Sequence, residues 1–201
     1  MKLEIWPGLL ALGVSICVGV SVARADGQFI EKIEPYAITG TSGVELYASI
    51  GERGPVVGDQ VRTIAHTNFK LTWSRKYEPR GNTCTLVSAR PKLIVTYTLP
   101  RPAGKLPAAL QKRWDIFIDG VRRHEKVHGD HIREMVARIE QTTIGVTVQN
   151  DPKCKKIREE IKTPLSQASL AQRQKSRDFD RVEMGAGGNM QRLILDLVNG
   201  R

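Results

Sequence analysis

The chain of 201 residues carries 31 Lys and Arg residues against 21 Asp and Glu residues, which gives a formal net charge of +10. This is enough chain for one domain with a hydrophobic core. Beyond the N-terminal segment, no stretch approaches the roughly 18 apolar residues of a membrane span, which excludes a transmembrane segment in the rest of the chain.

Residues 1–25 predict a secretory signal peptide. An apolar run from Leu9 to Val22 follows Lys2 and is too short for a comfortable membrane span. The segment Ala23-Arg24-Ala25 has the small-x-small form of a cleavage site, so we expect cleavage after Ala25. The mature chain would then be periplasmic or secreted, and an uncleaved anchor is the alternative.

The mature chain would keep +9 of the net charge, because residues 1–25 contain two basic residues and one acidic residue. A basic protein exported into a Gram-negative-like envelope meets anionic lipopolysaccharide, anionic lipid and acidic cell-wall material before it meets nucleic acid. The charge alone selects none of these partners.

Two cysteines remain after processing, Cys84 and Cys154. An exported compartment is oxidising, so we predict a single disulfide between them. Two free thiols are the alternative. Neither cysteine lies in a Cys-x-x-Cys spacing, which argues against a metal-ligand role.

The first predicted elements are a strand and a helix. Residues 28–39 are short, partly alternating in polarity and compatible with a strand. Ser42 then offers an N-cap with Glu45 three residues later, a capping box for a helix that ends at Gly51 or Gly54.

Two alternating segments give the clearest strand signal. Apolar and polar side chains alternate in residues 68–77, NFKLTWSRKY, and residues 92–99, KLIVTYTL, repeat the pattern. The turn-rich residues 78–84 separate them, so we predict antiparallel neighbours. One face of this sheet needs cover, which the helix that follows would provide.

A helical pattern extends over residues 106–143. Asp151 and Pro152 then predict the start of a second helix, with the aspartate as cap and the proline in the first turn. This helix would be kinked at Pro164 and continue as a polar helix toward Asp180.

Together these elements predict an α+β fold, in which a small antiparallel β-sheet packs against the long helix and a further C-terminal helix follows. Residues 26–185 would form the domain, and residues 186–201, with the amphipathic QRLILDLVN, a C-terminal tail. The disulfide would tie the sheet to the last long helix.

His124-Glu125-x-x-His128 in the long helix has the H-E-x-x-H pattern of zinc metallopeptidases. Residues four apart in a helix lie one above the other, so both imidazoles reach one Zn²⁺ ion at about 2.0–2.1 Å. The glutamate is offset by roughly 100° and can take a proton from a zinc-bound water, whose pKa the metal lowers to about 7. The pattern predicts His124 and His128 as ligands of one zinc ion and Glu125 as the catalytic base.

The helical wheel gives an independent test of this motif. With His124 at 0°, an apolar stripe falls between about 20° and 120°, and His128 (about 40°) and Glu125 (about 100°) lie within it. The stripe consists of Leu110, Trp114, Phe117, Ile118, Val121, Ile132, Met135, Val136 and Ile139. A carboxylate there costs several kcal/mol unless its charge is compensated, as a bound dication and its water would do. Two hydrogen-bonded core histidines with Glu125 as their partner, or a structural zinc without catalysis, are the alternatives.

A third protein ligand should come from outside the motif. The candidates are Asp180, Glu183, His66 and Glu134. A carboxylate from a later helix favours the first two of these. His131 also faces the site, but seven residues span roughly 10.5 Å of helix, so a shared zinc would require a break at Gly129. We interpret His131 as a histidine near the mouth of the cleft.

These features resemble the bacterial predicted secreted zinc-dependent protease family, an H-E-x-x-H family filed as domain of unknown function 922. The resemblance covers roughly residues 35–185 and is carried, in order, by YAITGTSGVEL, FKLTWSRKY, NTC, RWDIFIDGVRRHEKVHGDH, PKC and DFD. It implies export, a zinc-binding helix formed here by His124, Glu125 and His128, and pairing of Cys84 with Cys154.

One departure from that family concerns the third ligand. Many members follow a Tyr-Asp pair with a histidine five positions after the aspartate, whereas here Phe179-Asp180 is followed at that position by Gly185. If that histidine completes the site in relatives, this chain must use Asp180, Glu183 or an additional water, or it has lost activity.

The predicted function is hydrolysis of peptide bonds in peptide or protein substrates by a periplasmic or secreted metallopeptidase with one zinc ion. The rival interpretation is a catalytically inactive or structural-zinc protein that binds anionic envelope components. A nucleic-acid partner is not expected, because export removes it and no aromatic-basic binding motif is present.

Overall fold

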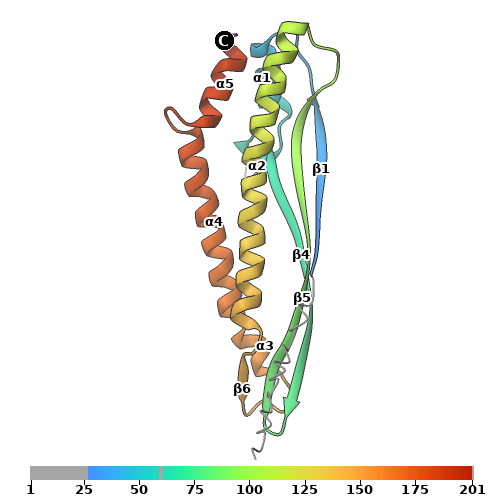
Figure 1. Ribbon diagram of the computed structural model, residues 1–201, viewed down its shortest axis with the longest axis vertical. Coiled ribbons are helices and arrows are strands. Elements are labelled where there is room, and N and C mark those ends of the chain that lie inside the picture. The colour runs from blue at the N-terminus through green and yellow to red at the C-terminus, as the bar shows by residue number, and fades with distance from the viewer. Residues whose placement is uncertain (1–26, 59–60, 201) are drawn as a thin grey trace, which may run out of the picture.

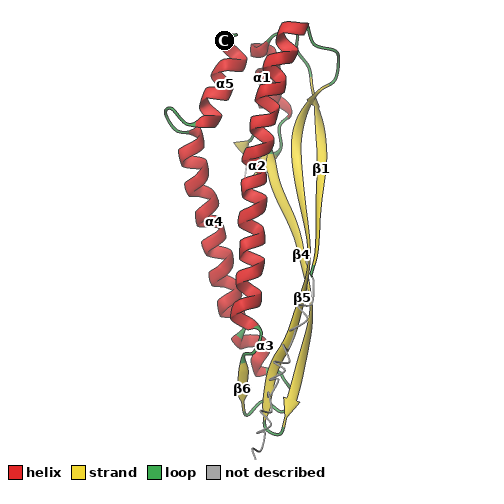
Figure 2. Cartoon of the chain, viewed as in Figure 1, coloured by secondary structure: helices red, strands yellow, loops and turns green. Residues whose placement is uncertain are grey.

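The computed structural model describes residues 27–58 and 61–200. Helices α2, α4 and α5 lie on one side of the main sheet (Figure 1). Figure 2 shows the same view coloured by secondary structure, with α2 between the sheet and helices α4 and α5. In chain order the elements are β1 (Gln28–Ile38), α1 (Gly43–Arg53), β2 (Val56–Val57), β3 (Val61–Arg62), β4 (His66–Arg80), β5 (Thr83–Pro102), α2 (Ala108–Thr143), β6 (Thr147–Gln149), α3 (Lys156–Glu160), α4 (Lys162–Met184) and α5 (Asn189–Asn199).

The central strand of the main sheet is β5, which lies between β1 and β4 and pairs with β6 near its start. β4 and β5 are antiparallel, which confirms the predicted pairing of the two alternating segments. β1 is an edge strand that runs parallel to β5, in an otherwise antiparallel sheet. The α+β class is confirmed. On the face of β5 that packs against the helices, the buried side chains are Leu93, Val95, Tyr97 and Leu99.

Both long strands extend beyond the predicted segments. β4 continues to Arg80 and β5 begins at Thr83, so the predicted joint of residues 78–84 shrinks to a turn at Gly81 and Asn82. Gly81 has a φ of +57°, which glycine adopts without steric cost. The two-residue turn allows the strands to pair along the whole hairpin.

The predicted capping box begins α1. The Glu45 N–H donates to the Ser42 hydroxyl at 3.2 Å, and the Glu45 carboxylate accepts from the Thr41 N–H at 2.7 Å. An N-cap of this kind stabilises a helix by about 1 kcal/mol. The helix ends at Arg53 with Gly54 as its C-cap, the second of the two predicted ends.

The long helix α2 buries its predicted apolar stripe in the main core. The buried members are Leu110, Trp114, Phe117, Ile118, Val121, Ile132, Met135, Val136 and Ile139. Met190, Leu193 and Leu197 of α5 join the same core. Burial of one such side chain stabilises the fold by about 1.5–3 kcal/mol. The core therefore holds α2 rigidly between the sheet and the C-terminal helices.

The predicted start of the second helix at Pro152 is wrong. Residues 152–154 form a turn and bend, and α3 begins at Lys156. Asp151 still acts as a cap, because its carboxylate accepts hydrogen bonds from the Lys155 and Ile157 N–H groups at 2.7 and 2.9 Å. These bonds need the intervening turn, which brings the first helical N–H groups back toward the carboxylate.

The predicted kink at Pro164 is present as a break between α3 and α4. The interruption falls at Ile161, three residues before the proline. Proline has no backbone N–H to donate to the hydrogen bonds of a helix. It is tolerated in the first turn, where the N–H groups have no acceptor within the helix. Pro164 accordingly lies in the first turn of α4.

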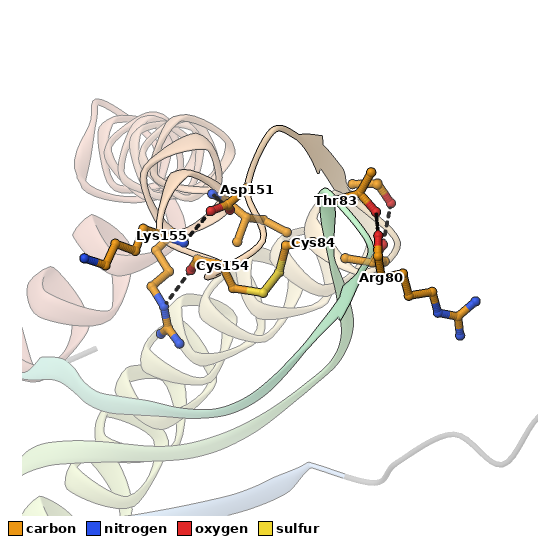
Figure 3. Close-up of a disulfide and its surroundings, with 10 residues drawn as sticks. Arg80, Thr83, Cys84, Asp151, Cys154 and Lys155 are labelled. Atoms are coloured by element: carbon orange, nitrogen blue, oxygen red, sulfur yellow. Dashed lines mark hydrogen bonds between the residues drawn. A yellow bond between two sulfur atoms is a disulfide. The ribbon is translucent and has the colours of Figure 1, made fainter.

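The predicted disulfide joins Cys84 of β5 to Cys154 before α3 (Figure 3). The Cα atoms are 5.3 Å apart and the two residues are 70 positions apart in sequence. On the chain-entropy model a loop of this length gives a stabilisation of about 4 kcal/mol. Both cysteines are buried in a small second core with Leu86, Ile157 and Ile161. The disulfide thus ties the sheet to the segment that leads into α4.

The sequence predicts a secretory leader at the N-terminal end of the chain and a separate tail at the C-terminal end. The predicted leader, residues 1–25, lies outside the described residues. α5 forms within the predicted tail of residues 186–201 and packs into the core, while the predicted domain bounds stay a prediction. Among the helices of the described residues, none has the length and apolar character of a membrane span.

Candidate metal centre

The centre lies where α4 crosses the middle of α2. His124 and His128, one turn apart on α2, place their Nε2 atoms 3.1 Å from each other. Asp180 of α4 directs Oδ1 at both rings, 3.2 Å from His124 Nε2 and 2.9 Å from His128 Nε2. Three potential ligand atoms from two helices therefore converge on one point.

The separations within this triangle fit a bound metal ion. Ligand atoms held at about 2.0–2.1 Å in tetrahedral geometry lie about 3.3–3.4 Å apart. The three observed separations, 2.9 to 3.2 Å, need only a small expansion to reach that value. His124, His128 and Asp180 thus form a group that could hold a metal ion with three protein ligands.

The charges of this group favour a cation. For Asp180, burial acts to raise the pKa, but hydrogen bonds from His124 and His128 and their charges lower it well below its usual range. For His128, burial acts to lower the pKa, but the hydrogen bond and charge of Asp180, together with the charge of Glu125, raise it overall. Each shift stabilises the charged form, so positive charge among these atoms is favourable.

The other nitrogen of His124 faces a second carboxylate. His124 Nδ1 is buried without a hydrogen-bond partner among the described residues, and Glu183 Oε2 lies 3.7 Å away. A bound metal ion would replace the proton through which Nε2 faces Asp180. The ring proton would then lie on Nδ1, where the Glu183 carboxylate attracts it.

Glu125 lies beside this group and is not part of it. Its side chain is 6% exposed, as its place on the apolar stripe predicts. The Thr67 hydroxyl of β4 donates to Glu125 Oε2 at 2.5 Å and approaches the Glu125 carbonyl oxygen at 3.1 Å. The alternative in which Glu125 is the hydrogen-bond partner of the histidines is not what the structure shows, because Asp180 takes that place and the Glu125 carboxylate accepts from Thr67.

Of the other predicted candidates for the third ligand, Glu183 is the nearest to the group. Glu134 pairs with Lys175 on an exposed surface. His66 lines the cleft, but its register opposite Thr98 places it on the face of β4 that points away from α2. Neither belongs to the metal-binding group.

His131 is not a ligand either. The helix continues unbroken through Gly129, so His131 stays one turn beyond the group, buried at 7% exposure. Its Nδ1 lies 3.2 Å from the Ser176 hydroxyl of α4. His131 therefore packs against α4, and the expected position near the mouth of the cleft is wrong because α4 covers it.

Three residues that sequence reasoning did not single out for a role support the centre. The Phe179 ring stacks on the His124 ring, with the ring centroids 4.8 Å apart. Gly129 allows α2 to lie close to β5, because a Cβ atom at this position would lie only 2.2 Å from Tyr97 Oη. Thr67 orients Glu125. The position of Thr67 could have been predicted from the sequence, because strand alternation places its side chain on the same face as Phe69, toward α2.

A cleft of about 630 Å³ opens onto the three ligand atoms and Glu125. Its walls are β4, α2 and α4, and residues at the start of β4 form one side. The residues around the centre include Ala65, Thr67, Phe69, Ile132, Gln172 and Arg177. A substrate segment in this cleft would have direct access to the group.

One of the comparisons with known proteins gives a match. No curated protein and no solved structure matches the chain. One family model matches residues 33–188, a span that contains β4, β5, the disulfide, α2 and Asp180 of α4. The chain therefore belongs to the family described as bacterial protein of unknown function (DUF922).

Proposed function

We propose that this protein is an exported zinc metallopeptidase that hydrolyses peptide bonds. The observation that carries the proposal is the convergence of His124, His128 and Asp180 on one point beside the buried carboxylate of Glu125. A site that only stabilised the fold would not need a carboxylate next to its ligands.

The donor set supports zinc. Two imidazole nitrogens and one carboxylate oxygen are a common set of three protein ligands for catalytic zinc, which leaves a fourth position for water or substrate. Calcium and magnesium prefer sites built from oxygen atoms. Asp180 is 47% exposed on its side chain, so the fourth position would face the cleft.

The bound ion would polarise the scissile carbonyl and lower the pKa of the attacking water. Glu125 is the base that takes the proton from this water and passes it to the leaving amine. The hydrogen bond from the Thr67 hydroxyl to Oε2 fixes the carboxylate, which leaves Oε1 as the oxygen that acts on the water. Asp180 would supply the third ligand, and Glu183 beside Nδ1 would keep the His124 imidazole in the orientation that binds the metal.

Two features support export. The N-terminal segment has the pattern of a secretory leader, and Cys84 and Cys154 form a disulfide, a bond that persists in oxidising compartments. We therefore propose a periplasmic or secreted location.

A chelation experiment tests the proposed function. Incubation with o-phenanthroline is expected to abolish the hydrolysis of an unfolded protein such as reduced casein, and added zinc is expected to restore it. The non-chelating isomer m-phenanthroline is the control and should have no effect. Hydrolysis that persists after the metal is removed would contradict the proposal.

Glu183 is expected to set the metal affinity without binding the metal. Its carboxylate is the nearest acceptor for His124 Nδ1–H, and loss of such an outer partner typically weakens metal binding about 10- to 100-fold. Glu183→Ala should raise the zinc dissociation constant by this factor in a competition titration. Glu159→Ala, at an exposed position on α3, is the matched control. An unchanged dissociation constant for Glu183→Ala would show that Nδ1 has another partner.

A further inference from the structure

The face of the main sheet that points away from α2 carries a line of unpaired positive charges. Residues that lie side by side on neighbouring strands of this face form rows across the sheet. Strand register places one cation in each of five successive rows. In order these rows are Asn68-Thr96-Lys32, Lys70-Ile94-Ile30, Thr72-Lys92-Gln28, Ser74-Arg90 and Lys76-Ser88. All five cations are exposed.

The five rows form an extended surface. Successive residues on one face of a strand are about 6.7 Å apart, so five rows extend over about 27 Å. Helices α2, α4 and α5 lie on the opposite side of the sheet (Figure 1). No acidic residue lies in these rows, which are bordered by Glu34 beyond one end and by Glu78 beyond the other.

Several cations on the helical side of the molecule are paired. Lys126, Arg133 and Lys175 each lie beside an acidic group. None of the five cations of the rows forms an ion pair with any described residue. Like charges at neighbouring positions destabilise a sheet, so an external anionic surface would relieve a repulsion that the fold itself leaves uncompensated.

We propose that this basic sheet face docks on an anionic phospholipid surface. The spread of charge over three strands suits a surface of phosphate headgroups. The rows contain no Phe, Tyr or Trp side chain, so they lack the stacking platform with which proteins bind nucleic acid strands. Ile30, at 38% exposure, and Ile94 beside it can contact the interfacial region.

Docking in this way would leave the metal centre accessible. The three candidate ligands belong to α2 and α4, which lie on the opposite side of the sheet (Figure 1). The protein would therefore rest on the membrane with the helices that carry the metal centre turned away from the lipid plane. This inference does not depend on the proposed hydrolysis, because a protein without activity would dock by the same charges.

A vesicle-binding experiment with a charge-matched control tests the proposal. The full gene product is expressed with its own leader, and the exported form is mixed with vesicles of phosphatidylcholine containing about one-third phosphatidylglycerol. One Lys or Arg near such a surface contributes roughly five-fold to the partition coefficient, so Lys70→Gln, Arg90→Gln, Lys92→Gln should lower it about 100-fold.

The control removes the same net charge from elsewhere. Lys112→Gln, Arg138→Gln, Lys153→Gln alters exposed residues outside the sheet and should retain nearly all binding. Both variants should show the circular dichroism and zinc content of the wild type. Equal loss in the two variants, or equal binding to vesicles of phosphatidylcholine alone, would overturn the proposal. Binding to dextran sulfate without binding to the anionic vesicles would also overturn it and assign the face to a soluble polyanion.

Discussion

Replacement of Glu125 with glutamine is expected to lower kcat for peptide hydrolysis about 100- to 10,000-fold, because general base catalysis contributes a factor of this size. Glutamine has nearly the same shape and can still accept the hydrogen bond of the Thr67 hydroxyl. It cannot take a proton from water. Zinc content and thermal stability should therefore stay close to those of the wild type, and single-turnover kinetics with an unfolded protein substrate would measure the loss.

Glu134→Gln provides the matched control for this variant. Glu134 lies on the same helix, but it is exposed and pairs with Lys175. Its replacement should change kcat by less than two-fold, because an exposed ion pair of this kind contributes only about 0.2–1 kcal/mol. If Glu125→Gln kept full activity, Glu125 would be a structural carboxylate, and the assigned base would be wrong.

Replacement of Asp180 with alanine is expected to have the largest effect on metal binding outside the motif. The variant loses one of three ligand atoms and the negative charge that stabilises the cation. Its zinc affinity should fall by more than the factor of about 10 to 100 that is typical of outer-shell partners. A competition titration against a fluorescent chelator would measure the change.

Asp178→Ala distinguishes a ligand effect from a general effect on α4. Asp178 lies two residues away on the same helix and pairs with Arg181 at 2.5 Å. Its replacement should leave zinc affinity unchanged. Equal zinc affinity in the Asp180 and Asp178 variants would exclude Asp180 as a ligand. The third ligand would then be another side chain or a water molecule.

The part of the site that lies on α2 could be predicted from sequence because one helix determines it. The wheel placed His128 and Glu125 on the apolar stripe, with His124 at its edge, and all nine apolar members are buried in the structure. Such a prediction needs only helical geometry and the tendency of apolar side chains to pack inward. The disulfide was predictable for a similar reason, since two cysteines in an oxidising compartment have one pairing.

The sequence favoured two candidates for the third ligand, Asp180 and Glu183, but could not decide between them. Asp180 and Glu183 lie three residues apart on α4, so both face α2, and their distances depend on how the two helices cross. That crossing is set by the break at Ile161 and by tertiary packing. The structure places Asp180 at the two Nε2 atoms and Glu183 near His124 Nδ1. Gly185 follows the end of α4 and contributes no ligand atom.

Two features of the sheet were not predictable from local pattern. The parallel alignment of β1 with β5 depends on a crossover through elements that follow it in sequence, and alternation alone does not give strand direction. The Thr67–Glu125 hydrogen bond joins residues 58 positions apart. Long-range contacts of this kind follow from the complete fold rather than from any segment of it.

The metal content of the purified protein tests the central claim most directly. Inductively coupled plasma mass spectrometry of wild-type protein, purified without chelator, should find about one zinc ion per chain, as expected for a site with three protein ligands. The variant His124→Ala, His128→Ala should contain almost none while it keeps its disulfide and secondary structure. Wild-type protein without a transition metal, even after incubation with zinc, would contradict the account, and so would equal zinc content in the variant.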